Sequence, residues 1–185
     1  MLRTTLRGRN PVLRLLWLAP ALMLLAASAL AQEKTKGKEK KPKDPEFLRV
    51  YFESPRDTTS RAMEARVGRS SPMVITVEKL PILSESHIKI VEVVSGEGGS
   101  SLRITFNRMG RRLLENYTAT GIGRRLVLQT QFDEEARWLG APRITRRISD
   151  GILLFAPDAT PEELDRLVRG VTKWVKKNNL ADPDI

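Results

Sequence analysis

Apolar and polar residues alternate along much of the chain beyond residue 46, and this two-residue period is typical of half-buried β-strands. The segment FLRVYFES places Leu48, Val50 and Phe52 on one face. The same alternation recurs, with different strength, in RAMEARV, PMVITVEKL, HIKIVEVV and LRITFN. Because the glycine-rich SGEGGSS separates the last two segments, we expect them to form a hairpin.

After this hairpin the period changes to about 3.6 residues, which predicts a first helix. Met109, Leu113 and Tyr117 recur at four-residue steps between residues 108 and 120. The glycines of TGIGRR then favour a helix end, since glycine readily adopts the left-handed backbone conformation with which many helices terminate.

A second helix has the clearest start signal in the chain. Thr160 is suited to the N-cap, Pro161 to the first helical position, and Glu163 completes a capping box with the threonine. Lysines gather near the carboxyl end of this helix, where the helix dipole favours cations. Its apolar stripe consists of Leu164, Leu167, Val168, Val171, Trp174 and Val175.

The residues between the two helices predict further extended segments. RLVLQTQF returns to the strand pattern, and DEEARWLG is typical of a short helical turn. APRITRRIS and GILLFA are predicted as two extended pieces around Asp150 and Gly151. The resulting β-β-α-β-β-α order predicts an α+β fold, in which an antiparallel-rich sheet has both helices packed on one face.

The first 31 residues predict a secretory signal peptide. Four arginines accompany the apolar run from Leu15 to Leu25, and Ala29 and Ala31 are the small residues expected before a cleavage site at Gln32. The alternative is an uncleaved membrane anchor, because the apolar stretch to residue 31 is about as long as a short membrane span. The chain has no cysteine, which fits export to a bacterial periplasm without disulfides.

Residues 32–46 lack apolar side chains and alternate lysine with glutamate, glycine and proline, which predicts a disordered linker. The alternative is that this lysine-rich segment binds an anionic membrane surface or another polyanion. Residues 47–185 then form a single α+β domain, a length that suits one hydrophobic core. They carry 22 basic and 18 acidic residues, so that most of the net charge of +10 lies outside the predicted domain.

Few residue types suited to catalysis are present. The chain has one histidine, His87, and no cysteine, which excludes most zinc sites and the nucleophilic triads that depend on histidine. We interpret His87 as a solvated residue at a strand edge. We therefore predict no enzyme activity, no catalytic residue, no metal and no cofactor.

Carboxylates cluster in two places, and the clusters are Asp133, Glu134, Glu135 and Asp158, Glu162, Glu163. We interpret the first as an acidic first helical turn and the second as part of the capping box. Two alternatives remain: either cluster could bind a hard cation, and a hydrolase would require Asp133 to Glu135 and Asp158 to converge in one cleft.

Arginines in the second half of the predicted domain are the candidate binding residues, namely Arg124, Arg125, Arg143, Arg146 and Arg147. If residues 141–149 form a strand, Arg143 and Arg147 share one face while Arg146 takes the other, so that the arginines cannot all line one groove. They form either a basic surface for acidic polypeptide segments or anionic lipid, or a solvated sheet edge that discourages strand pairing. Nucleic acid is not an expected partner, because aromatic residues are not interleaved with these arginines.

The order of several short motifs resembles the head part of the first periplasmic domain of SecD, an accessory subunit of the bacterial Sec translocase. In that family, a strand pair follows a segment with proline and leucine, a helix leads to a strand, and an Ala-Pro strand precedes the last helix. The matching positions are Pro81, Leu83, Thr118, Gly123 to Leu126, Ala141, Pro142, Ile144, Ile148, Gly151 and Thr160 to Glu163. Each motif is short, and the resemblance lies in their shared order.

The resemblance implies a stand-alone domain, like the SecD head, that binds polypeptide. It is incomplete, because QFDEEARWLG replaces the tight Asp-Gly turn of the family and no membrane span is predicted beyond residue 46. We expect an exported, periplasmic, non-enzymatic module that binds a polypeptide or envelope protein and is accessory to protein export or envelope biogenesis. The alternative is an envelope tether, in which residues 32–46 bind anionic membrane or polyanion and the domain is a passive head.

Overall fold

The structure is a computed structural model that describes residues 43–45, 47–54, 61–96, 99–133 and 135–178. All described residues belong to one compact unit of the chain. The predicted signal peptide, residues 1–31, and all but residues 43–45 of the predicted linker, residues 32–46, lie outside the described residues.

Within these ranges, the helices begin where the sequence predicts them. They are α2 (Arg108–Thr120) and α3 (Pro161–Asn178), and a short 3-10 turn, η2, spans Glu85–His87. The strands are β1 (Leu48–Phe52), β2 (Ala62–Val67), β3 (Met73–Glu78), β4 (Ile88–Gly96), β5 (Gly99–Phe106), β6 (Leu126–Phe132), β7 (Glu135–Gly140) and β8 (Ile152–Phe155).

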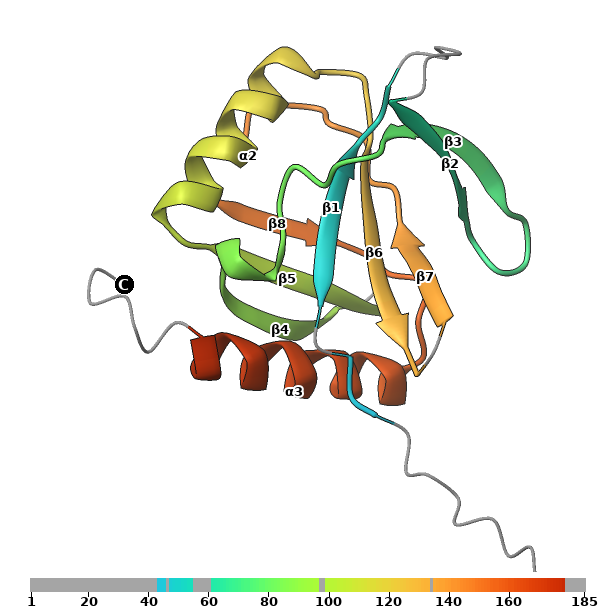
Figure 1. Ribbon diagram of the computed structural model, residues 1–185, viewed down its shortest axis with the longest axis vertical. Helices are drawn as coiled ribbons and strands as arrows, with labels where there is room; N and C mark the ends of the chain where they lie inside the picture. Colours follow the sequence, from blue (N-terminus) through green and yellow to red (C-terminus); the bar gives the residue numbers. More distant parts are fainter. Residues whose placement is uncertain (1–42, 46, 55–60, 97–98, 134, 179–185) are drawn as a thin grey trace, which may run out of the picture. The chain divides into compact units, whose positions relative to one another are not determined.

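The strands form three antiparallel sheets with the orders β1-β6-β7, β2-β3 and β4-β5-β8. The hairpin predicted around the glycine-rich turn is β4-β5, in which Val91 lies opposite Ile104. The strands of the two three-stranded sheets cross each other (Figure 1). The prediction of an α+β fold with antiparallel strands and two helices is confirmed, and the strands are divided among the three sheets.

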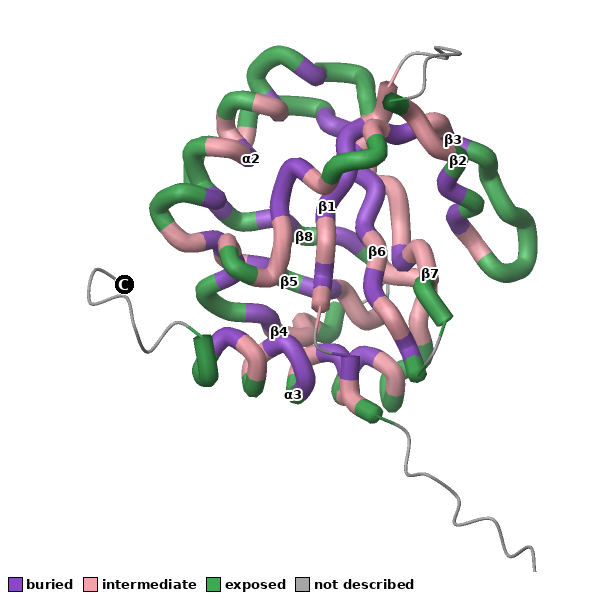
Figure 2. Tube along the Cα trace, viewed as in Figure 1, coloured by how far each residue is buried: buried purple, intermediate pink, exposed green. Residues whose placement is uncertain are grey.

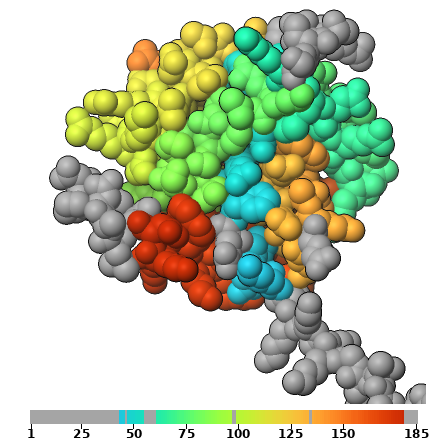
Figure 3. Space-filling view, in the orientation of Figure 1, coloured from blue at the N-terminus to red at the C-terminus, as the bar shows by residue number. Residues whose placement is uncertain are grey.

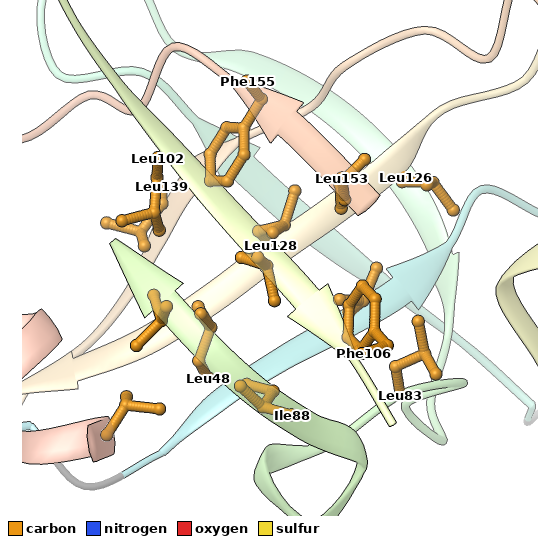
Figure 4. Packing of buried hydrophobic residues seen from close by; sticks show 14 of the residues in the cluster. Leu48, Leu83, Ile88, Leu102, Phe106, Leu126, Leu128, Leu139, Leu153 and Phe155 are labelled. Atoms are coloured by element: carbon orange, nitrogen blue, oxygen red, sulfur yellow. The ribbon is translucent and has the colours of Figure 1, made fainter. Parts of the chain in front are cut away.

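The main hydrophobic core lies between the two three-stranded sheets. Leu48 of β1 and Leu128 of β6 enter it from one sheet, and Leu102 of β5 and Leu153 of β8 enter it from the other. Figure 4 shows these side chains between the crossing strands, and Figure 2 shows that buried positions follow β1 and β6. Burial of each such leucine stabilises the fold by roughly 1.5 to 3 kcal/mol relative to an exposed leucine.

The β2-β3 hairpin covers the opposite face of the first sheet and builds a second, smaller core. Tyr51 and Val127 point into this core and pack there with Val77. Trp138 adds an edge-to-face contact with Tyr51, in which the ring centroids are 5.2 Å apart. β1 and β6 are therefore buried on both faces, which explains why they carry apolar residues at successive positions, as in Val-Tyr-Phe and Leu-Val-Leu.

Helices flank the main core. α3 packs against β4 and η2 and buries Leu167 and Val171, while α2 packs against β5 and η2 and buries Leu114. The predicted capping box at the start of α3 is present. The Thr160 N–H donates to Glu163 Oε2 (2.8 Å), and the Glu163 N–H donates to Thr160 Oγ1 (3.3 Å). Both bonds satisfy amide groups that have no partner within the helix.

Residues 43–45, at the end of the predicted linker, pack against α3. Pro45 is buried, and its carbonyl lies so close to Gly170 that a Cβ on Gly170 would overlap it. Arg166 donates a hydrogen bond to the Lys43 carbonyl at 2.8 Å. In the space-filling view, the cyan residues of β1 and of this segment fill the strip between α3 and β6 (Figure 3).

DEEARWLG differs from its prediction as a short helical turn, because residues 135–140 form β7, which pairs with β6. Tertiary packing explains the difference. Trp138 contacts Tyr51 in the small core, whereas the next residue, Leu139, is fully buried in the main core. Successive side chains are therefore needed on opposite sides of the segment, and a strand provides this arrangement while a helix does not.

APRITRRIS also differs from its prediction as an extended strand beside GILLFA. Residues 141–151 form no strand, and their β-type pairing is limited to an isolated bridge between Arg143 and Arg125. GILLFA forms β8 as predicted, but β8 pairs with β5. Residues 141–151 are thus a loop that leads from the first three-stranded sheet to the edge of the second.

Candidate functional site

The loop of residues 141–151 begins with backbone hydrogen bonds to the segment that follows α2. The Ile144 N–H donates to the Arg124 carbonyl (2.8 Å), and the Gly123 N–H donates to the Ile144 carbonyl (2.8 Å). The Leu126 N–H donates to the Pro142 carbonyl (3.0 Å). These bonds lie on the same edge of β6 that pairs with β7 and extend that pairing beyond the end of β7. They hold the start of the loop against the first sheet.

The second half of the loop is fixed to α2. The Ile148 N–H donates to Thr118 Oγ1 (2.9 Å), and this buried hydroxyl donates in turn to the Leu114 carbonyl (2.7 Å). Gly151 has a left-handed backbone (φ 75°), and a Cβ there would come within 2.8 Å of Cγ of Arg111. The loop therefore has a defined backbone, set by side-chain and helix contacts, although it forms no strand.

A pocket of about 270 Å³ lies between this loop and β8. Its buried lining residues are Leu126, Ile144 and Leu153. Its exposed lining residues include Arg143, Arg146 and Arg147. The expectation that Arg143 and Arg147 face away from Arg146 was conditional on a strand at residues 141–149, and this condition is not met. It assumed a strand, in which side chains alternate between two faces, and the loop backbone has no such alternation.

The three arginines of the pocket differ in their partners. Arg147 forms an ion pair with Glu115 of α2, and Arg143 Nε donates to the Gly123 carbonyl at 2.8 Å. Arg146 is exposed and has no hydrogen-bond or ion-pair partner among the described residues. Its guanidinium is therefore available to an anionic group of a ligand.

Arg124 and Arg125 do not line this pocket. The Arg124 guanidinium lies over the Phe52 ring, 5.3 Å from its centroid. Arg125 is half-buried, and its Nη1 donates to the Ala141 carbonyl at 3.0 Å. Both side chains therefore have contacts within the fold, and their role in binding stays a prediction.

The outer edge of β8 borders the pocket and carries backbone groups without partners. The Phe106 N–H donates to the Gly151 carbonyl (2.9 Å), so this pair is hydrogen-bonded across the β5-β8 ladder. Hydrogen-bonded and non-hydrogen-bonded pairs alternate along an antiparallel ladder. The backbone N–H and C=O groups of Leu153 and Phe155 therefore point toward β5, whereas those of Ile152 and Leu154 point away from β5.

Asp150 satisfies one of the outward groups, since its Oδ1 accepts the Ile152 N–H at 3.0 Å. The Ile152 carbonyl and both the N–H and the carbonyl of Leu154 have no partner among the described residues. This arrangement leaves an open strand edge at which a further strand can pair. We refer to Ile152 through Phe155 with the bordering pocket as the β8 edge.

Two other sheet edges in the described part of the chain have backbone partners outside their own sheets. At β1, the Val50 N–H donates to the Leu83 carbonyl (2.9 Å), and the Val50 carbonyl accepts from the Ile82 N–H (2.8 Å). At β7, the Leu139 carbonyl accepts the Asp158 N–H (2.7 Å). At β4, Val91 and Val93 also point their backbone groups away from β5, and α3 packs against this strand. The β8 edge has a pocket beside its outward backbone groups.

Apolar side chains are exposed on the face of the second sheet that points away from the core. Ile152 is 38% exposed, Leu154 is 56% exposed, and Ile90 is 49% exposed. Thr105 lies between Ile90 and Ile152 in the register, while Arg103 lies next to Leu154. An added strand at the β8 edge would place side chains next to Ile152 and Leu154 on this face.

The carboxylate clusters are bound mainly by arginines in the described residues. Asp158 is bound by Arg69, and Asp133 by Arg166 at 2.9 Å. Glu163 accepts two hydrogen bonds from Arg137, which lower the pKa of its carboxyl to about 2. Asp133, Asp158 and Glu163 are thus each bound by an arginine, and Arg69 lies near both Asp158 and Glu163. Glu134 lies outside the described residues, and no group of three potential metal ligands occurs among the described ones.

His87 is half-buried rather than solvated at a strand edge. It lies under the first turn of α2, where a Cβ on Gly110 would come within 2.8 Å of the His87 Cβ. Its Nδ1 accepts the Ser84 N–H at 3.1 Å, and burial lowers the pKa of the imidazole. These contacts give His87 a structural role in joining η2 to α2.

Comparison with solved structures finds similarity to SecDF. No protein-family model and no curated protein sequence matches the chain. It is similar to a solved structure of SecDF, described as a membrane component that enhances protein export, with 14% identity and a TM-score of 0.48. That match covers 69% of this chain and 62% of the other.

Two further SecDF structures are similar over a smaller share of their own length. The super-membrane-facing form is 14% identical with a TM-score of 0.42, and the match covers 83% of this chain and 33% of the other. SecDF from Thermus thermophilus, described as a translocon-associated membrane protein, is 13% identical with a TM-score of 0.37, covering 81% and 33%. The chain thus spans between one third and two thirds of the length of these proteins.

The structural comparison returns the same family that the order of sequence motifs resembles. At these identities the likeness concerns the arrangement of strands and helices, and it carries no argument about function. Neither α2 nor α3, the helices of the described residues, combines the length and apolar composition needed to cross a bilayer.

Proposed function

We propose that this chain is an exported periplasmic module that binds polypeptide without enzymatic activity, by adding an extended segment of its partner to the β8 edge. The observation that carries the proposal is the set of unpaired backbone groups at Ile152 and Leu154 beside an open pocket. Strand addition uses such groups, because the backbone of any peptide can complete their hydrogen bonds. The partner is a polypeptide or envelope protein, and the process served is protein export or envelope biogenesis.

The size of the edge predicts weak, reversible binding. Three outward backbone groups are open, and each completed hydrogen bond contributes about 0.5 to 1.5 kcal/mol. Contact with the exposed side chains of Ile152 and Leu154 adds a hydrophobic contribution. Because ordering the peptide opposes both, we expect a dissociation constant on the order of micromolar or weaker. Such affinity suits a module that captures and releases polypeptide.

The test is a titration of the full chain against a fluorescently labelled unfolded polypeptide, followed by anisotropy at low and at moderate salt. We expect saturable binding that persists at moderate salt, because backbone hydrogen bonds and apolar contacts are less screened than surface charges. Binding that vanishes with salt would instead point to general electrostatic attraction and would contradict strand addition.

Leu154→Pro tests the place of binding. Proline removes the outward N–H of residue 154, and the ladder to β5 does not use this N–H, so the sheet itself should form. Leu154→Ala is the matched control, since it shortens the same side chain but keeps the N–H. We expect the proline variant to lose most of the binding and the alanine variant to keep most of it. Equal binding by both would place the polypeptide elsewhere.

A further inference from the structure

We infer that the β8 edge selects extended segments in which apolar residues alternate with glutamate. The inference rests on the proposed strand addition and specifies the ligand of that site. It follows from what each face of an added strand would meet, because successive side chains of a strand point to opposite faces of the sheet.

One set of side chains of the added strand would lie on the outer face of the second sheet. Ligand residues that pair with Ile152 and Leu154 would point their side chains to the same face of the sheet as the side chains of Ile152 and Leu154. Ile152, Leu154 and Ile90 are exposed apolar residues on this face. Apolar side chains of the ligand would remove them from water, whereas polar side chains would gain nothing from the contact.

The other set of side chains would point toward the pocket, where apolar and basic groups lie together. Leu126, Ile144 and Leu153 are buried residues in its lining. Arg143, Arg146 and Arg147 are exposed residues in the lining of the same pocket. A ligand side chain there needs an apolar stem and an anionic end, and glutamate combines the two.

The charges around the pocket favour an anion. Its lining contains three arginines and one carboxylate, Asp150, which gives a formal charge of +2. Asp150 Oδ1 accepts the Ile152 N–H, so that part of its charge is already engaged. Arg147 has Glu115 as a partner, while Arg146 has no partner among the described residues. Arg146 is therefore the arginine of this pocket that we expect to form the ion pair with a ligand carboxylate.

Three labelled nine-residue peptides test this selectivity against the full chain at moderate salt. They have valine at every odd position and glutamate, glutamine or lysine at every even position. We expect the glutamate peptide to bind about tenfold more tightly than the glutamine peptide, in line with one charge-assisted contact in a pocket of formal charge +2, and the lysine peptide to bind least.

Variants of the chain connect this preference to the pocket. Arg146→Gln should reduce the advantage of the glutamate peptide over the glutamine peptide to about threefold or less. Arg66→Gln is the matched control, because Arg66 is an exposed arginine on β2 without a partner among the described residues. It should leave the advantage unchanged. An equal effect of both substitutions would mean that only net charge matters, and it would overturn the inference.

The remaining outcomes separate this inference from the proposed function. If the glutamate and glutamine peptides bind equally and Leu154→Pro abolishes the binding of both, the selectivity is refuted while strand addition stands. If none of the peptides binds, or if Leu154→Pro leaves their binding unchanged, both proposals are refuted. If the glutamate peptide is preferred, and Arg146→Gln and Leu154→Pro each reduce its binding, both are supported.

Discussion

Arg137 and Glu163 form a bidentate ion pair that joins β7 to the first turn of α3. Arg137 Nη1 and Nη2 donate to the two carboxylate oxygens of Glu163 at 2.7 and 2.9 Å. Arg69, between β2 and β3, lies 3.6 Å from the same carboxylate and also binds Asp158. One carboxylate thus connects β7, the β2-β3 hairpin and the start of α3, and the hydrogen bonds from Arg137 are the main reason for the lowered pKa of Glu163.

Glu163→Gln should therefore destabilise the fold by about 1 to 2 kcal/mol, because it removes the charge from a bidentate, half-buried pair and weakens the capping box. The measurement is the midpoint of urea unfolding followed by circular dichroism at pH 7. Glu162→Gln is the control, since Glu162 is exposed in the same helical turn and should change the free energy of unfolding by less than about 0.5 kcal/mol. Equal midpoints for the two variants would show that the ion pair contributes nothing.

The same carboxyl predicts how stability depends on pH. Its pKa is about 2 in the folded chain and 4.5 in the absence of the fold. The unfolded chain therefore binds the proton first, so the contribution of Glu163 is complete above about pH 4.5 and is lost as the pH falls toward 2. Urea unfolding at pH 6, 4 and 3 should show the wild type losing more stability than Glu163→Gln. If the free energy of unfolding fell by the same amount in the wild type and in Glu163→Gln as the pH was lowered, this role of Glu163 would be contradicted.

Gly170→Ala should destabilise the fold although alanine is the better helix former. Helix propensity alone would stabilise α3 by about 1 kcal/mol. However, a Cβ at this position would overlap the Pro45 carbonyl, so residues 43–45 would have to leave α3. We expect a net loss of stability in thermal unfolding, together with faster proteolysis at residues 43–45. Lys173→Ala, an exposed change in the same helix, is the control and should alter neither quantity. A stabilised Gly170→Ala variant would show that the segment does not pack there.

Helices and most strands of this fold follow from local sequence signals. α2 ends at the glycines expected to end it, and α3 begins at the threonine and glutamate expected to cap it, because both signals act within one turn. β7 was not predicted, because the acidic residues at its start favour a helix locally. Trp138 and Leu139 lie on opposite sides of the segment because one contacts Tyr51 and the other is buried in the main core.

The candidate site was predicted in part. The sequence singles out Arg143, Arg146 and Arg147, but the pocket that joins them depends on a loop whose backbone partners lie elsewhere in the chain, at Thr118 and Gly123. Likewise, GILLFA indicates a strand but does not reveal that its outer edge is open. Which strand pairs with which is decided by long-range packing, so a free edge has no local signal.

Thr118→Val provides the last test, because it changes the loop without touching the pocket lining. The Thr118 hydroxyl is buried, donates to the Leu114 carbonyl and accepts the Ile148 N–H. Valine has the same shape but cannot accept this N–H, which would be left without a partner at a cost of about 1 to 3 kcal/mol. Two measurements follow, the free energy of unfolding and the affinity for the labelled unfolded polypeptide.

We expect Thr118→Val to lower both quantities, since a loosened loop no longer holds the arginines of the pocket beside β8. Thr120→Val is the matched control: Thr120 is exposed, and its hydroxyl bonds only the Asn116 carbonyl within the same helix. It should bind polypeptide as the wild type does. If Thr118→Val lost stability but bound polypeptide with unchanged affinity at a temperature where it is fully folded, the loop would not be part of the binding site. Binding would then depend on the backbone of β8 alone, and the basic residues of the loop would have to be assigned another role.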